Sequence, residues 1–201
     1  MRAQSPLSLW YEEPAREWNE ALPVGNGRLG AMVFGGIIEE RLQLNEETCW
    51  SGEKFDFVNP NARKSLPRIR KLLFEGKYVE AKELAEKSLM GDKRIHSSYQ
   101  TLGDLRLFFD HDASSVSGYR RELDIENAIA KVSFQTGGVR YHREIFSSAP
   151  DNVVAVRMVT SGEGTISFRA ELTRPGNKAA FRKDGNNIVM AEHVGDGTGV
   201  R

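Results

Sequence analysis

The sequence predicts a mainly β protein, a large antiparallel β-sandwich of the supersandwich type that carries an inserted helical hairpin. From residue 105 onward, apolar residues recur with the period of two that is typical of half-buried strands. Glycine-rich turns separate these short runs at regular intervals, as in sandwich proteins. Between about residues 60 and 91 the period changes to that of a helix, which indicates an insertion between two β regions.

The strands expected after residue 100 are short and evenly spaced. Gly137-Gly138 is expected to join two of them as a two-residue hairpin. Val153–Val159 is almost uniformly apolar, which predicts a strand deep within a sheet. Gly195–Arg201 resembles a turn leading into another strand, so we expect the sandwich over residues 1–201 to be incomplete at its C-terminal end. The predicted strands are Leu105–Phe109, Tyr119–Ile125, Ile129–Thr136, Val139–Ser148, Val153–Val159, Thr165–Leu172 and Asn187–Ala191.

The insertion, at about residues 60–91, is expected to contain two helices. Asn59-Pro60-Asn61 is a favourable helix start, Gly76 separates the helices and Gly91 closes the second. The basic residues near the start favour a solvated helix face over a phosphate site, because acidic residues follow them. The apolar positions are Leu66, Ile69, Leu72 and Leu73 in the first helix, and Tyr78, Ala81, Leu84, Ala85 and Leu89 in the second.

Gly25–Gly30 matches the dinucleotide-binding pattern GxGxxG letter for letter. That motif requires a buried parallel strand before it and a helix after it. Here a short, proline-containing segment precedes it, and a short apolar run closed by glycines follows. The sequence therefore predicts an exposed, type I′-like turn at Asn26-Gly27 that leads into a strand, and we expect no nucleotide site.

Composition excludes several classes of protein. The 28 basic and 28 acidic residues cancel, so no net field attracts nucleic acid or an anionic membrane. The single cysteine, Cys49, excludes an internal disulfide framework. The N-terminal segment has no apolar core of signal-peptide length, and no apolar run is long enough to span a membrane, so we expect a cytoplasmic protein.

Motifs for common enzymatic chemistry do not occur in the sequence. It has no Gly-x-Ser-x-Gly elbow and no Walker loop, and we expect neither a cofactor nor a metal. The histidines His96, His111, His142 and His193 lack metal-ligand spacing, so surface or strand positions are expected for them. Among the acidic residues, Glu46 and Glu47 lie in a distinctive setting, between Asn45 and Trp50, although a structural carboxylate is the favoured interpretation.

Several ordered blocks of the sequence resemble a known family. They are Leu9–Ala15, Trp18–Met32, Gln43–Gly52, Tyr99–Leu105 and Tyr119–Asp124. Together they resemble the N-terminal domain of glycoside hydrolase family 95, the inverting α-L-fucosidases, over nearly the whole chain. The sequence departs from the family at Cys49, where leucine is more familiar, and at Thr101, where proline is more usual.

The resemblance implies an N-terminal β-sandwich domain that precedes a helical linker, an (α/α)6 barrel and a C-terminal β domain. It also implies release of L-fucose from α-1,2-linked glycans, with α-L-galactosides preferred by some members. The family's general-acid glutamate and its water-orienting asparagines and aspartate lie on the barrel, for which this chain has no matching segment. We therefore assign no catalytic residue and expect this segment alone to be inactive.

The expected partners are the barrel, on which the sandwich would pack, and the carbohydrate substrate, bound through that barrel. An interdomain seam is favoured over stacking on sugar rings for the candidate residues. A stand-alone carbohydrate-binding sandwich without catalysis is the main alternative, followed by a fragment without a ligand. A phosphorylase with a related sandwich is a further alternative, but the quoted sequence blocks favour the fucosidase family over it. The candidate residues are Trp18, Asn26, Arg28, Asn45, Glu46 and Trp50.

Overall fold

The computed structural model describes residues 7–51, 58–91, 98–162, 164–176 and 179–192. It divides the chain into two compact units, of which the first comprises residues 1–49 and 101–193. The second comprises residues 50–100 and 194–201. The predicted turn over 195–201, together with His96 and His193, lies outside the described residues.

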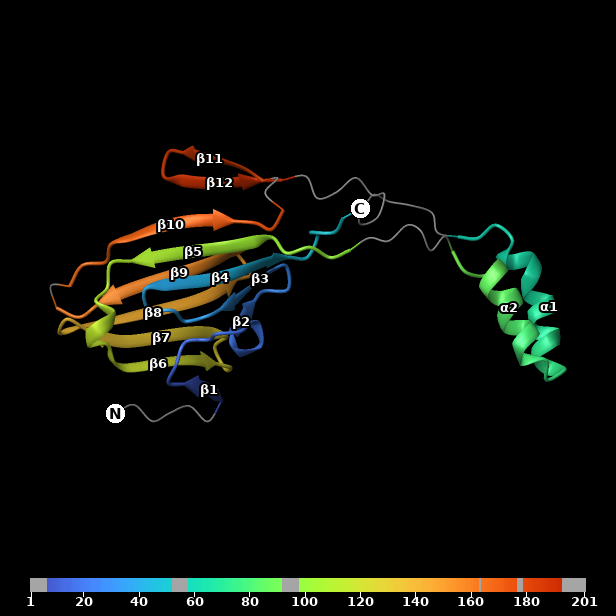
Figure 1. The fold of residues 1–201 in the computed structure, drawn as a ribbon, viewed down its shortest axis with the longest axis horizontal. Helices are drawn as coiled ribbons and strands as arrows, with labels where there is room; N and C mark the ends of the chain where they lie inside the picture. The colour runs from blue at the N-terminus through green and yellow to red at the C-terminus, as the bar shows by residue number, and fades with distance from the viewer. Residues whose placement is uncertain (1–6, 52–57, 92–97, 163, 177–178, 193–201) are drawn as a thin grey trace. The chain divides into compact units, whose positions relative to one another are not determined.

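Two five-stranded antiparallel sheets form the two layers of a sandwich in the first unit (Figure 1). One sheet contains, in spatial order, β1 (Ser8–Tyr11), β6 (Ser117–Asp124), β7 (Ile129–Thr136), β8 (Val139–Ser148) and β9 (Val153–Thr160). The other contains β10 (Phe168–Thr173), β5 (Gly103–Phe109), β4 (Glu39–Glu46), β3 (Leu29–Val33) and β2 (Leu22–Gly25). The unit also contains the two-stranded sheet of β11 (Ala180–Asp184) and β12 (Asn187–Ala191), and the 3-10 helices η1 (Trp18–Glu20) and η2 (Ala113–Ser115).

The hydrophobic core lies between the two large sheets. Alternate residues of a strand point to opposite faces, so each strand contributes one row of side chains to the interior. Val33 and Leu42 come from one sheet, Ala130 and Ile145 come from the other, and all four are fully buried in one cluster. The sandwich predicted from the sequence is therefore confirmed.

The strand predictions agree closely in β7 and β8, whose observed bounds equal the predicted ones. Gly137 and Gly138 between them have φ angles of 56° and 78°, as a type I′ hairpin turn requires. The expectation that Val153–Val159 lies deep within a sheet is wrong, because β9 is the terminal strand of its sheet in the described part of the chain. Val154 and Val156 pack against the core, whereas Val153 remains exposed, so apolar composition did not indicate the number of neighbouring strands.

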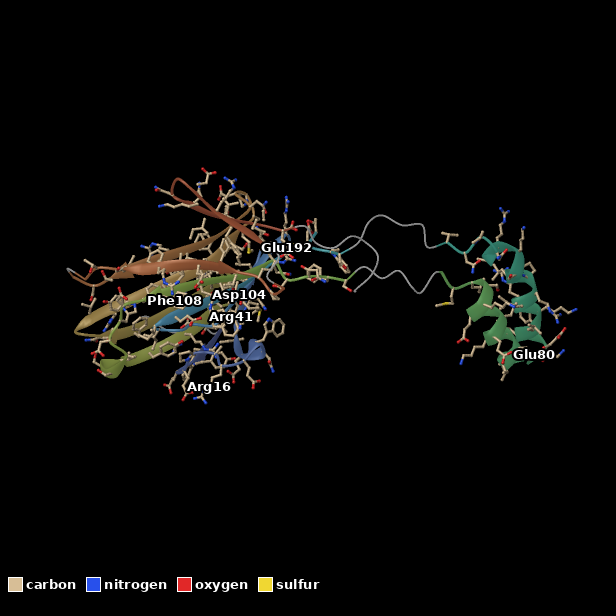
Figure 2. The ribbon with its side chains drawn as sticks, turned by 45° about the horizontal axis from the view of Figure 1, so that its top comes forward. Arg16, Arg41, Glu80, Asp104, Phe108 and Glu192 are labelled. Atoms are coloured by element: carbon tan, nitrogen blue, oxygen red, sulfur yellow. The ribbon has the colours of Figure 1, made fainter. Side chains whose placement is uncertain are left out.

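The outer face of the second sheet is polar. Arg41 on β4 and Asp104 on β5 form an ion pair of 2.9 Å (Figure 2). Phe108, also on β5, lies beneath the guanidinium groups of Arg106 and Arg169, at 5.6 and 4.1 Å from its ring centroid. This face thus combines charged groups with the aliphatic stems that carry them, as expected for the solvated side of an antiparallel sheet.

A buried ion pair between Glu40 of β4 and Arg143 of β8 connects the two sheets. The Glu40 carboxylate also accepts hydrogen bonds from the backbone N–H groups of Gly35 (2.8 Å) and Arg41 (3.1 Å). The Arg143 guanidinium donates a second hydrogen bond to the carbonyl of Gly36 at 3.1 Å. Burial raises the pKa of Glu40, and the attraction of Arg143 and these donors opposes that rise.

The second unit contains the predicted helical hairpin, formed by α1 (Ala62–Phe74) and α2 (Tyr78–Ser88). Ile69, Leu72 and Ala81 are buried between the helices, and Gly76 adopts the positive φ of 74° that ends the first helix. Leu73 and Tyr78, expected on the apolar faces, are exposed instead. Both lie beside the connecting turn, where the helices offer few facing residues.

Replacing Arg143 with methionine should lower the free energy of unfolding by about 3–5 kcal/mol, because the Glu40 carboxylate would stay buried without its cation. Arg157→Met is the matched control, since Arg157 forms an exposed ion pair with Glu144 in the same sheet. That change should cost less than about 1 kcal/mol. Urea unfolding followed by circular dichroism measures both, and equal losses would contradict a dominant role for the buried pair.

Candidate functional site

The turn between β2 and β3 is organised by the side chain of Asn26. Its Oδ1 accepts hydrogen bonds from the backbone N–H groups of Arg28 (3.0 Å) and Leu29 (2.7 Å). Its Nδ2 donates to the carbonyl of Ser148 in β8 at 2.8 Å, which links the turn to the other sheet. The predicted type I′ turn is wrong, because Gly27 has a positive φ (94°) but Asn26 does not. The asparagine side chain replaces part of the turn's backbone hydrogen bonding.

Arg28 and Glu46 meet at the same end of the β2–β3–β4 sheet. Arg28 Nε donates to Glu46 Oε1 at 3.0 Å, and Glu46 Oε2 accepts from the hydroxyl (2.6 Å) and backbone N–H (2.8 Å) of Thr48. The Thr48 hydrogen bonds, assisted by Arg28, lower the pKa of Glu46. This carboxylate is therefore held in its ionised form and does not have the raised pKa of a general acid.

The remaining candidate residues occupy different places. Asn45 pairs in register with Gly30 across β3 and β4, next to the Arg28–Glu46 pair. Trp18 lies in η1, and 56% of its surface is exposed. Trp50 belongs to the second unit, where it forms a β-bridge with Tyr99 and its ring centroid lies 5.1 Å from that of Tyr99. The structure thus gathers Asn26, Arg28, Asn45 and Glu46 at one end of a sheet and places Trp50 in the other unit.

The GxGxxG pattern has no nucleotide-binding geometry. It spans the end of edge strand β2, the turn and the start of β3, which pair antiparallel, and the next element is strand β4 rather than a helix. Within the described ranges, no group of three or more His, Cys, Asp and Glu residues is arranged to hold a metal ion. In the part of the chain that the structure describes, no helix is long and apolar enough to cross a membrane. The side chains of Asn26, Arg28 and Glu46 at the sheet end are held instead by hydrogen bonds within the chain.

A surface basin of about 460 Å³ was not anticipated from the sequence. Its lining residues Glu12 and Glu13 are adjacent in the sequence, but Arg121, which binds the Glu13 carbonyl, comes from a distant strand. Arg121 points to the same face of β6 as Tyr119 and Leu123. This alternation was the one feature of the sequence that could have indicated an inward position for Arg121. We call this hollow the β1 basin; its lining residues are Tyr11, Glu12, Glu13, Pro14, Arg16, Asn19, Glu20 and Arg121.

Glu46→Gln should lower the melting temperature at neutral pH, because an amide cannot accept from both Arg28 and Thr48 as the carboxylate does. A lowered folded-state pKa contributes stability above the ordinary value of 4.5, and this contribution is lost as the pH falls below it. The difference in melting temperature between the unaltered chain and Glu46→Gln should therefore shrink as the pH falls from 7 towards about 3. Glu126→Gln, in the exposed β6–β7 turn, is the control. A difference that does not vary with pH would contradict this assignment.

Comparison with known proteins agrees with this architecture. The family model described as "Glycosyl hydrolase family 65, N-terminal domain" matches residues 9–199. The chain is 43% identical over 166 residues to Alpha-L-fucosidase 2 of Arabidopsis thaliana, covering 82% of this chain and 19% of that protein. It is 34% identical over 196 residues to Probable alpha-fucosidase A of Aspergillus niger, covering 91% and 24%. The corresponding protein of Aspergillus oryzae is 30% identical over 173 residues, with coverage of 80% and 23%.

The chain spans between about a fifth and a quarter of the length of these curated relatives. Their names agree with the resemblance of the quoted sequence blocks to family 95. The two-sheet sandwich, the inserted helical hairpin and the match over residues 9–199 lead to one conclusion. The chain belongs to the N-terminal domain family of the glycoside hydrolases, as defined by the family 65 N-terminal model.

Proposed function

We propose that this chain is the N-terminal, non-catalytic β-sandwich portion of a longer, inverting α-L-fucosidase. The full-length protein would hydrolyse terminal α-L-fucosyl linkages, or α-L-galactosyl linkages of the same geometry. One observation carries the proposal. Relatives named as α-fucosidases align with 80–91% of this chain, which amounts to only 19–24% of their own length.

Two carboxylates among the described residues, Glu46 and Glu40, lack the properties of a general acid. Inverting hydrolysis requires a protonated acid and a separate base on opposite sides of the glycosidic bond, about 6.5–9.5 Å apart. Glu46 is held ionised by Thr48 and Arg28. Glu40 is fully buried against Arg143 and does not reach the surface. Neither residue can therefore donate a proton to a bound glycoside.

The role left for the sandwich is to pack on the catalytic barrel and shape its rim. The end of the β2–β3–β4 sheet is suited to such a contact, because Asn26, Arg28 and Glu46 are already fixed by hydrogen bonds. A preorganised polar surface loses little conformational freedom when it docks. Exposed aromatic residues such as Trp18 add apolar area of the kind enriched at interfaces.

Fucose release tests the proposal. An α-1,2-fucosylated oligosaccharide is incubated with the 201-residue chain and, separately, with the longest polypeptide produced from its gene. The longer polypeptide should release L-fucose, initially as the β-anomer by proton NMR, whereas the 201-residue chain should release none. Intact-mass measurement of the native protein accompanies the assay, and a mass well above 22.5 kDa is expected.

Release by the 201-residue chain alone would contradict a non-catalytic role. A longer polypeptide that released neither fucose nor L-galactose would contradict the α-L-fucosidase assignment. A native mass of 22.5 kDa would also contradict it and would leave a stand-alone module. If the sheet end contacts the barrel, Arg28→Ala should reduce the thermal stability of the longer polypeptide more than that of the 201-residue chain, because the Arg28 side chain is more than half exposed in this chain.

A further inference from the structure

We propose that the β1 basin is a binding site for a neutral saccharide. This goes beyond the proposed function and does not depend on it. The basin lies wholly within the first unit, at the edge of the sandwich where β1 ends. Arg16, one of its lining residues, is labelled in Figure 2.

Arg121 is the only buried residue that lines the basin, with 3% of its surface exposed. Its Nε donates to the carbonyl of Glu13 at 2.7 Å, and its Nη1 donates to the carbonyl of Glu20 at 2.5 Å. The remaining nitrogen, Nη2, has no hydrogen-bond partner among the described residues. A buried guanidinium with one unused nitrogen in a basin offers a charge-assisted donor to a ligand.

The wall of the basin is fixed before any ligand arrives. Arg121 binds the backbone carbonyls of both Glu13 and Glu20. The Glu20 side chain also binds the loop between these two residues, because its Oε2 accepts hydrogen bonds from the backbone N–H groups of Arg16 (2.7 Å) and Glu17 (3.3 Å). These backbone donors lower the pKa of Glu20, so the loop carries a fixed negative charge. Such preorganisation reduces the entropy that a ligand must overcome on binding.

Two polar side chains of the basin remain unused. The Glu12 carboxylate and the Asn19 amide form no hydrogen bond or ion pair with any residue that the structure describes. The Arg16 guanidinium is engaged by Glu13 at 2.9 Å. The basin thus offers a free acceptor at Glu12, a donor and an acceptor at Asn19, and a donor at Arg121 Nη2.

Tyr11 adds an apolar surface beside these groups. It lies directly opposite Arg121 in the β1–β6 pairing, and the guanidinium carbon is 4.2 Å from its ring centroid. Tyr11 remains 42% exposed. An aromatic ring next to a few convergent polar groups is the usual composition of a small-ligand site. Aromatic rings also pack well against the C–H faces of a sugar, because they combine apolar area with a negative ring face.

Charge and hydrogen-bonding capacity select the ligand class. Three carboxylates and two guanidinium groups line the basin, so an anionic ligand gains no net attraction. An apolar ligand would leave Glu12, Asn19 and Arg121 Nη2 without partners, which is costly once water is displaced. A neutral polyol has hydroxyl groups that both donate to Glu12 and accept from Arg121, together with a C–H face for Tyr11. We therefore assign the β1 basin to a saccharide.

The test uses the 201-residue chain, labelled with nitrogen-15 and titrated with methyl α-L-fucopyranoside, methyl β-D-galactopyranoside and lactose. At least one probe should produce saturable NMR shifts at the Asn19 side-chain amide and at the Tyr11 backbone, with a Kd of about 0.1–10 mM. Glucuronate at equal concentration and salt should bind about tenfold more weakly, because Glu12 and Glu20 repel it.

Two variants locate the site without disturbing the fold, because the side chains they alter bind no other described residue. Glu12→Gln should weaken binding about tenfold, and Asn19→Ala about fivefold. Neither should change the melting temperature. Glu126→Gln, an equivalent change on an exposed turn away from the basin, should leave the affinity unaltered.

Absence of saturable binding by all three neutral probes would overturn the proposal, as would equal affinities in Glu12→Gln and in Glu126→Gln. Preferential binding of glucuronate would also overturn it, since it would indicate an anion site. None of these outcomes bears on fucose release by the longer polypeptide, so this proposal and the proposed function fail independently.

Discussion

The ion pair between Glu40 and Arg143 is the constraint on which the rest of the sandwich depends. It places two charges in the interior between the sheets, where burying either charge without the other would strongly destabilise the fold. Its geometry fixes the loop between β3 and β4, because Glu40 also binds the backbone N–H of Gly35. Gly35 has a φ of 77°, and a Cβ there would lie 2.7 Å from the Tyr119 hydroxyl, so glycine is required at this close approach.

The same region connects the buried pair to the surface. Tyr119, whose pKa burial raises, donates its hydroxyl hydrogen to the Gly35 carbonyl at 2.6 Å. Two residues further along β6, Arg121 faces the same side and reaches the carbonyls of Glu13 and Glu20. A row of polar inward residues on one strand therefore holds the β3–β4 loop at one point and the wall of the β1 basin at another. The shape of that basin follows from the packing of the sandwich interior.

The two polar surfaces differ in how far their groups are already satisfied. At the end of the β2–β3–β4 sheet, Asn26 and Glu46 use their hydrogen-bonding capacity within the chain. In the β1 basin, the side chains of Glu12 and Asn19 form no hydrogen bond with any part of the chain that the structure describes. A satisfied surface is suited to docking as a rigid face, whereas unused donors and acceptors beside an aromatic ring are suited to a small polar ligand. This difference separates a candidate domain contact from a candidate ligand site within one unit.

The sequence by itself determined the local features of this protein. The bounds of Ile129–Thr136 and Val139–Ser148, the Gly137-Gly138 turn and the helical hairpin follow from periodicity and turn residues, which act between near neighbours. Only the tertiary structure decided that β9 is a terminal strand, that Glu40 meets Arg143, and that Arg121 closes a basin with residues more than a hundred positions earlier. Those pairings depend on which strands become neighbours, and a period of two is the same whichever neighbours a strand acquires.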